Sequence, residues 1–152
     1  MHSRDHLVLE RVDRFVGEYL DRAVVADRTP LQVSAWQVPD RGDLPGEPVS
    51  VERMRQSAAF APVDPGHRWG RAWGTTWFTV EGEVPQAWAE RDGRIELSLD
   101  LGFSQAKPGF QCEGLVRTPE GVVVKGLEPR NHHVPVSNGP GERVSFTVEA
   151  AA

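Results

Sequence analysis

Residues 69–80 constrain the fold more than any other stretch, because glycine, aromatic and β-branched residues follow one another closely there. Three of the chain's five tryptophans stand at positions 69, 73 and 77, a four-residue spacing that would also suit a helix. Gly70 and Gly74 interrupt that spacing, and the run Thr-Thr-Trp-Phe-Thr-Val favours a strand. We therefore predict an approach loop over 69–74 and a strand over 75–80. Trp77 and Phe78 fall on opposite faces of this strand, which predicts that it is covered on both sides.

Residues 4–24 carry the one convincing helical pattern. Ser3 is the predicted cap, and Gly17 weakens the helix by about 1 kcal/mol relative to alanine. An apolar stripe of this kind docks either on its own domain or on a partner segment, and the sequence leaves both readings open. The stripe repeats at three- and four-residue steps and consists of Val8, Val12, Phe15, Val16, Tyr19 and Leu20.

Short strands are predicted at 31–38, 95–101, 110–118, 122–125, 133–136 and 144–149, because apolar residues alternate there and turn residues separate the runs. Gly114 indicates a bulge or a close backbone approach. A short helix is expected over 51–57 with Ser50 as its cap, and loops over 61–68, 81–93, 102–109 and 126–132. The sequence therefore predicts a mainly β protein: an antiparallel β-sandwich of the jelly-roll or galactose-binding-like kind, preceded by an N-terminal amphipathic helix.

Composition and charge exclude several classes of protein. The formal net charge of −5 argues against a nucleic-acid partner. No apolar run approaches the roughly 20 residues of a membrane span, and the N-terminus lacks the apolar segment of a secretory signal. The single cysteine, Cys112, fits a reducing compartment, so we expect a cytoplasmic protein with no membrane partner.

Few residues stand out as candidates for chemistry. His132 and His133 are adjacent, and adjacent strand residues point to opposite faces, so with or without His67 they predict a poor metal site. Cys112 has no base beside it in the sequence and fits a buried apolar position. Glu113 lies in an apolar strand but fits an outward-facing position better than a catalytic one. We therefore assign no catalytic, cofactor-binding or metal-binding residue.

The tryptophans offer one further possibility, because an aromatic face suits the apolar face of a sugar ring. We expect core packing for Trp73 and Trp77. Core packing is also expected for Trp36 and Trp88, which are nevertheless the two candidates for a sugar platform.

The chain carries an ordered series of short motifs. They are residues 69–80, Gly82-Glu83-Val84-Pro85, Leu97-Ser98-Leu99-Asp100, Glu113-Gly114-Leu115-Val116, Glu120-Gly121, Gly126-Leu127, His132, Gly141-Glu142-Arg143-Val144 and Val148-Glu149-Ala150-Ala151. In this order the motifs resemble the N-terminal region of bacterial α-mannosidases of glycoside hydrolase family 38. The upstream helix and residues 30–36 also resemble that region, so nearly the whole chain is covered.

The resemblance implies a β-sandwich that stands before a catalytic barrel. In that family the aspartate nucleophile, the acid/base and the zinc ligands lie in the barrel, so none is carried onto this chain. We expect a helical arm over 1–28 and a β-sandwich over 29–152, with the barrel absent. Residues 102–110 exceed the short link of the family, and the family runs on past the end of this chain. A fragment, a truncated reading frame and a free-standing relative all fit.

We therefore expect a non-catalytic N-terminal domain that packs on and supports the catalytic barrel of an α-mannosidase. The intact enzyme would be a retaining, zinc-dependent glycosidase acting on terminal α-mannosides, while this chain alone would be inactive and hold no cofactor. The expected partners are the catalytic domain, a second copy of the chain and a carbohydrate. An apolar patch should be exposed where the barrel is missing. The alternatives are a free-standing carbohydrate-binding module and a protein-interaction domain that works through the helix stripe.

Overall fold

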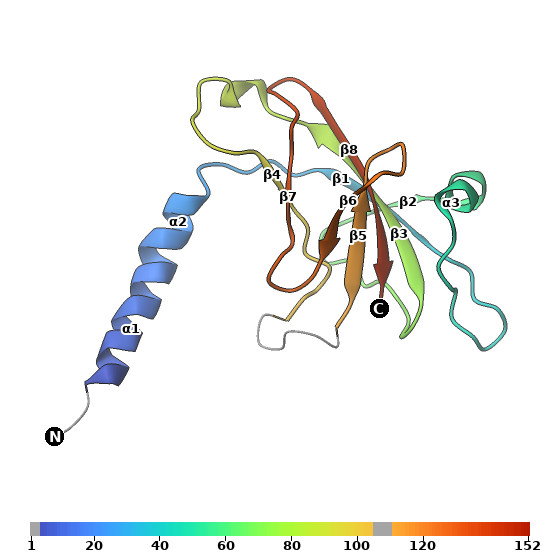
Figure 1. Ribbon diagram of the computed structural model, residues 1–152, viewed down its shortest axis with the longest axis horizontal. Helices are drawn as coiled ribbons and strands as arrows, with labels where there is room; N and C mark the ends of the chain where they lie inside the picture. The colour runs from blue at the N-terminus through green and yellow to red at the C-terminus, as the bar shows by residue number, and fades with distance from the viewer. Residues whose placement is uncertain (1–3, 105–110) are drawn as a thin grey trace. The chain divides into compact units, whose positions relative to one another are not determined.

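The computed structural model describes residues 4–104 and 111–152, and the chain divides into two units, Met1–Pro30 and Leu31–Ala152. The first unit is helical, with α1 at Asp5–Phe15, the π-helical turn η1 at Val16–Leu20 and α2 at Asp21–Val24 (Figure 1). The predicted helix is thus confirmed, although its middle is wound as a π-helix around Gly17. The predicted cap, Ser3, lies outside the described residues.

The apolar stripe is not buried by the described residues of the first unit. Phe15 and Tyr19 stack on each other with ring centroids 5.7 Å apart, and the six stripe residues are all exposed. Both readings of the helix, docking on its own domain and docking on a partner, therefore stay predictions.

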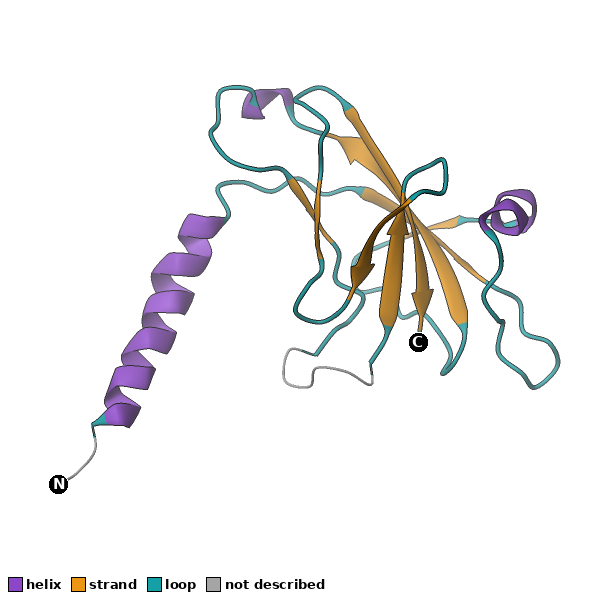
Figure 2. Ribbon diagram, in the orientation of Figure 1, coloured by secondary structure: helices purple, strands orange, loops and turns teal. Residues whose placement is uncertain are grey.

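The second unit is built on a six-stranded antiparallel sheet with the strand order β2-β1-β3-β8-β5-β6. Its strands are drawn in orange in Figure 2. A two-stranded ribbon, β4-β7, packs over one face of the sheet through the main core, and α3 packs against the other face through a second, smaller core. The strands are β1 Gln32–Gln37, β2 Ala61–Val63, β3 Thr75–Glu83, β4 Glu96–Ser98, β5 Glu113–Arg117, β6 Val123–Leu127, β7 His133–Pro135 and β8 Arg143–Ala151; the helical segments are α3 Val51–Ser57 and the 3₁₀ turn η2 Gln86–Trp88.

Strand β3 is the centre of this sheet. It pairs with β1 over six residues and with β8 over nine, from Thr75↔Ala151 to Glu83↔Arg143. Trp77 is fully buried in the smaller core with Val38 and Met54, whereas Phe78 belongs to the main core. The prediction that this strand is covered on both faces is confirmed.

The main core lies between the six-stranded sheet and the ribbon. Leu97 and Val134 of the ribbon face Val116 and Val148 of the sheet, and all four are buried. The predicted alternation over 95–101 is confirmed in its faces, because Ile95 and the other apolar members pack against the same core. As a hydrogen-bonded strand, however, β4 is limited to Glu96–Ser98.

Several predicted boundaries are wrong. Residues 61–63 form β2 rather than a loop; proline there is tolerated because β2 is an edge strand, where Pro62 need not donate. Strand β3 continues to Glu83 and β6 to Leu127, into segments predicted as loops. In each case pairing with a distant strand extends the element beyond its apolar run. The segment 105–110, predicted as part of a loop and a strand start, lies outside the described residues.

Gly114 is a place of close approach, but the approach is by side chains. A Cβ there would lie 2.7 Å from Leu101 Cδ1 and 3.2 Å from Leu127 Cδ1. The register shift between β5 and β6 falls between Val116 and Arg117 instead. The predicted bulge is therefore misplaced, and the atoms close to this position are the ends of two leucine side chains rather than backbone.

Two smaller predictions concern α3 and the surface. Ser50 caps α3, as predicted, by accepting a hydrogen bond of 3.2 Å from the Arg53 backbone N–H.

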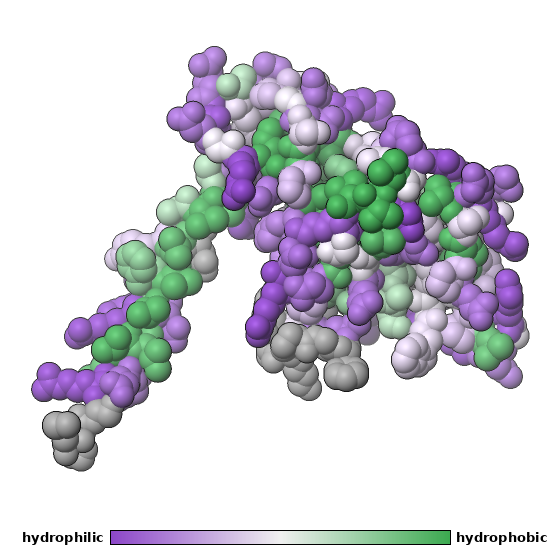
Figure 3. Space-filling view, viewed as in Figure 1, coloured by the Kyte–Doolittle hydropathy of each residue, from purple (hydrophilic) through white to green (hydrophobic). Residues whose placement is uncertain are grey.

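Val122, Val123 and Val124, which we call the valine patch, are exposed on the β5–β6 hairpin, where Figure 3 shows an apolar area. None of the helices in residues 4–104 and 111–152 is long and apolar enough to cross a membrane.

Replacing Trp77 tests the role of β3. Trp77→Ala should lower the free energy of unfolding by about 3–5 kcal/mol, because it opens a cavity in a packed core. Chemical denaturation followed by circular dichroism measures this change. The matched control is Trp73→Gly, which removes an exposed indole and should alter stability by less than about 1 kcal/mol. Equal losses in the two variants would contradict the assignment of Trp77 to the core.

Candidate functional site

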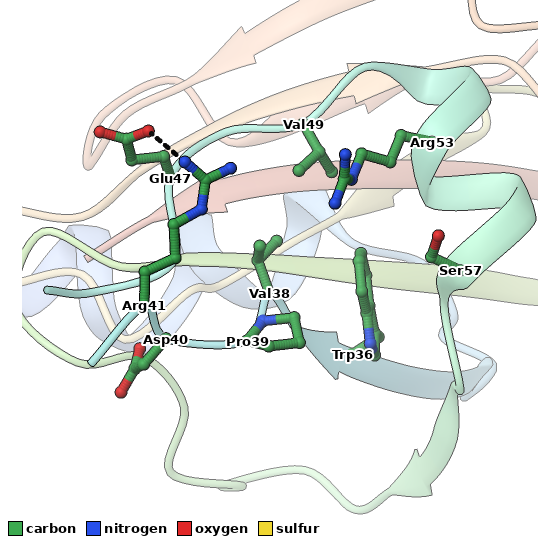
Figure 4. Close-up of a pocket in the computed structure, with 9 residues that line it drawn as sticks. All are labelled: Trp36, Val38, Pro39, Asp40, Arg41, Glu47, Val49, Arg53 and Ser57. Atoms are coloured by element: carbon green, nitrogen blue, oxygen red, sulfur yellow. Dashed lines mark ion pairs between the residues drawn. The ribbon is translucent and has the colours of Figure 1, made fainter.

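A hollow of about 240 Å³ lies on the α3 side of the sheet beside Trp36 (Figure 4). Trp36 and Val38 come from the end of β1 and the residue after it, while Arg53 and Ser57 project from α3. The loop that follows β1 contributes Arg41 and Glu47. An aromatic ring, hydroxyl and guanidinium donors and a carboxylate therefore share one small concave surface.

The strand register explains why the indole faces this hollow. Trp36 pairs with Trp77, so both rings lie on the α3 side of the sheet, and Trp36 is half-buried against the smaller core. The loop after β1 is tied to β3 by the Val38 N–H, which donates to the Thr75 carbonyl, and by the Thr75 N–H, which donates to the Gly46 carbonyl, each at 2.9 Å. Glycine is needed at position 46, because any Cβ would collide with the Val38 carbonyl.

The charged side chains around the hollow differ in how many hydrogen bonds and ion pairs they form. Asp40 accepts from Arg71 Nη1 at 2.7 Å through Oδ2 and from the Gly46 N–H at 3.1 Å through Oδ1, so its carboxylate braces the loop. Arg41 and Glu47 lie 3.7 Å apart and are largely exposed, so their ion pair contributes little to stability. The Arg53 guanidinium makes no hydrogen bond or ion pair with the described residues.

The hollow has the size of a small polar ligand, and each of its two carboxylates is paired with an arginine. A ring-sized space with one aromatic surface and several donors fits a single sugar unit. Glycoside cleavage needs two carboxyl groups acting together on one bond. Asp40 is held by Arg71 and the Gly46 N–H, and Glu47 lies beside Arg41. The geometry therefore favours binding.

Which tryptophans are buried and which are exposed differs from the prediction at one position. Trp77 is buried, as expected, and Trp88 is partly buried against the main core. Trp69 packs edge-on against Phe78 with ring centroids 5.4 Å apart. The prediction of core packing for Trp73 is wrong, because Trp73 is 87% exposed on a turn and has φ of +67°. Nothing in the residue pattern indicated that left-handed backbone.

The rings of the two adjacent histidines contact each other, although they were predicted to point to opposite faces of a strand. The rings of His132 and His133 lie 4.6 Å apart, because His132 precedes the start of β7 and strand alternation does not apply to it. His132 also stacks on Phe103, and its Nδ1 lies 3.2 Å from the Pro129 carbonyl. Within the described ranges, no three His, Cys, Asp or Glu side chains gather closely enough to hold a metal ion, with or without His67.

The other two candidates lie at the start of β5. Cys112 is half-buried, its Sγ lies 3.5 Å from the Leu101 carbonyl, and burial raises the pKa of the thiol, with the nearby Asp100 charge adding to the effect. A raised pKa disfavours the nucleophilic thiolate. Glu113 is exposed. Neither residue is placed for catalysis.

Sequence reasoning missed one half-buried ion pair. Arg117 Nη2 donates to Glu149 Oε2 at 3.2 Å, and Arg117 Nη1 donates to the Gly121 carbonyl at 3.3 Å. Both side chains are about one-fifth exposed. The pair joins β5 to β8 and holds the turn of the β5–β6 hairpin. The sequence shows only that Arg117 and Glu149 carry opposite charges. It does not reveal that β5 and β8 pair, which is what brings the two side chains together.

Comparison with known proteins gave one result. A family model described as "Alpha-mannosidase, jelly roll domain" matches residues 29–152. A search of curated proteins found no match.

The thiol of Cys112 provides a test of this part of the structure. At pH 8 a thiolate-specific reagent should modify the folded chain more slowly than the chain in denaturant, because burial raises the pKa of the Cys112 thiol. The contribution of Cys112 to stability is fully present below the pKa of the unfolded thiol and is lost as pH rises through the raised value. A folded chain that reacts as fast as a free thiol at neutral pH would contradict this placement.

Proposed function

Because the chain belongs to the Ams1-like alpha-mannosidase jelly roll domain family, we propose that it is the non-catalytic N-terminal domain of an α-mannosidase of glycoside hydrolase family 38. In this proposal the domain packs on and supports a catalytic barrel that lies outside the sequence, as in the bacterial enzymes that it resembles. The observation that carries the proposal is the family match, which spans the whole of the second unit, Leu31–Ala152.

The chemistry of the described residues supports a non-catalytic role. The carboxylates of the hollow beside Trp36 are paired with arginines, Glu113 is exposed, and the raised pKa of the Cys112 thiol disfavours a nucleophile. Leu44 and Trp73 are exposed apolar side chains of the kind that another domain would cover. The intact enzyme would hydrolyse terminal α-mannosides with retention of configuration. We place it in the cytoplasm, because a single cysteine fits a reducing compartment.

Zinc would belong to the catalytic barrel of that enzyme. In this chain the His132–His133 pair does not fit a zinc site, because zinc needs three or four ligands in tetrahedral array and the described residues bring no third donor to the pair. The ring of His132 instead contacts the rings of His133 and Phe103. In this proposal no step through a metal is therefore assigned to the described residues.

A second candidate function is carbohydrate binding, and the hollow beside Trp36 favours it. The indole supplies an apolar surface, and Arg53 and Ser57 supply donors on one side of α3 (Figure 4). A volume of about 240 Å³ limits the ligand to about one sugar unit. Such a domain could act as a free-standing module or place a mannoside chain near a catalytic domain.

The primary proposal predicts that the purified 152-residue chain does not hydrolyse an aryl α-mannoside, while the longer protein that contains the barrel does. Release of nitrophenol, followed by absorbance with and without added zinc, measures both. Turnover by the 152-residue chain that is lost in Glu113→Gln or Glu47→Gln would contradict a non-catalytic role.

The second candidate predicts weak, saturable binding of mannose oligosaccharides in calorimetric titrations. Trp36→Ala should reduce the affinity at least about tenfold by removing the stacking surface. Trp73→Gly is the matched control and should bind unchanged, because it removes an exposed indole outside the hollow. Absence of binding by the unmodified chain, or equal loss in both variants, would exclude the hollow as a sugar site.

A further inference from the structure

Trp73 is an outlier in two independent respects. Among the exposed large hydrophobic residues of the described ranges it is the most exposed, at 87%, and in those ranges it is the one non-glycine residue with a positive φ, at +67°. Left-handed backbone is unfavourable for a bulky residue, and such strain persists where the surrounding structure enforces it, often at binding sites. The placement gives the isolated domain no packing benefit, because the ring stays in water.

The turn that carries Trp73 is firmly held. The Trp73 N–H donates to the Ala152 carbonyl at 2.6 Å, and the Ala152 N–H donates to the Gly74 carbonyl at 3.2 Å. The Gly74 N–H closes the turn on the Arg71 carbonyl at 2.7 Å. These bonds join the turn to the end of β8, so the indole is presented from a fixed backbone.

A second exposed apolar side chain lies on the neighbouring loop. Leu44 is 67% exposed, on a tight turn in which Arg41 and Leu44 exchange backbone hydrogen bonds of 2.9 and 3.2 Å. Arg71 ties this loop to the Trp73 turn by donating to Asp40 Oδ2 and to the Asp43 carbonyl. Both loops lie at the end of the sheet where β8 ends (Figure 1). We call Leu44 and Trp73 the turn pair.

The small area of the turn pair decides which partner it suits. A tryptophan buries about 150–250 Å² on binding, whereas a stable complex of separate proteins needs about 800 Å² from each partner. The turn pair is therefore too small to hold two independent molecules together. Domains within one polypeptide meet at an effective concentration of order millimolar, so a small hot spot is enough to fix their contact.

Two other occupants fit less well. A sugar needs donors around the ring, and the guanidinium of Arg71, two residues before Trp73, already donates to Asp40 and to the Asp43 carbonyl. A second copy of this chain would need the larger area given above. The chemistry calls for an apolar recess that takes an indole and a leucine side chain.

From these observations we infer that Trp73, with Leu44, anchors this domain to the catalytic domain of the same α-mannosidase. The inference rests on the proposed function and specifies the contact through which the two domains pack. The held turn presents the indole before docking, so little backbone ordering is needed when the contact forms.

Oxidative footprinting with mass spectrometry tests this contact at single-residue resolution. Trp73 should be oxidised rapidly in the 152-residue chain and at least about tenfold more slowly in the intact enzyme, where the docked state excludes the oxidant. Val122 is the internal reference, because it is also exposed but lies on the β5–β6 hairpin.

A matched pair of variants separates docking from folding. Trp73→Gly retains the left-handed backbone and should lower the ratio of docked to undocked enzyme about 30-fold, as for loss of a hot-spot side chain. Differential scanning calorimetry of the intact enzyme should then show the two domains unfolding separately, while Val122→Ala leaves them coupled. The 152-residue chain should unfold at the same temperature with and without Trp73→Gly.

The outcomes distinguish the inference from the proposed function. An active mannosidase in which Trp73 is oxidised as fast as in the 152-residue chain would overturn the inference alone. Protection that appears in the 152-residue chain and grows with its concentration would point to a second copy and also overturn it. A full-length protein without mannosidase activity would contradict the proposed function, and the inference with it.

Discussion

The pairing of β3 with both of its neighbours is the interaction on which the rest of the domain depends. Its nine residues pair with β8 over their whole length and with β1 over six positions. Because Trp77 and Phe78 are buried on opposite faces, the same strand supplies a large ring to each of the two cores. The ribbon and α3 are attached to the sheet through these two cores, so neither face could be assembled without β3.

The beginning of β3 also organises the two candidate surfaces. Thr75 exchanges backbone hydrogen bonds with Val38 and Gly46, which shape the hollow beside Trp36. Two residues before Thr75 lies Trp73, on the turn tied to the end of β8. Arg71 connects the two surfaces through Asp40. The start of β3 therefore positions both the hollow and the turn pair at one end of the sheet.

The sequence predicted the features that arise from local pattern, and the structure confirmed them. The β-branched and aromatic run at 75–80 and the alternation around Leu97 determined which residues face the cores. Features that depend on distant partners were missed. Strand β2 contains Pro62 and is formed only by pairing with β1, and the left-handed turn at Trp73 depends on Ala152. The contact of the His132 and His133 rings likewise follows from where β7 begins.

An experimental structure of the intact α-mannosidase with a bound substrate analogue would test the central claim most directly. Our account predicts that the sheet built on β3 is retained, that the reacting sugar and the zinc ion are bound entirely by another domain, and that Leu31–Ala152 contacts that domain from outside the active site. A carboxylate or a histidine from Leu31–Ala152 in contact with the reacting sugar or the metal would contradict it.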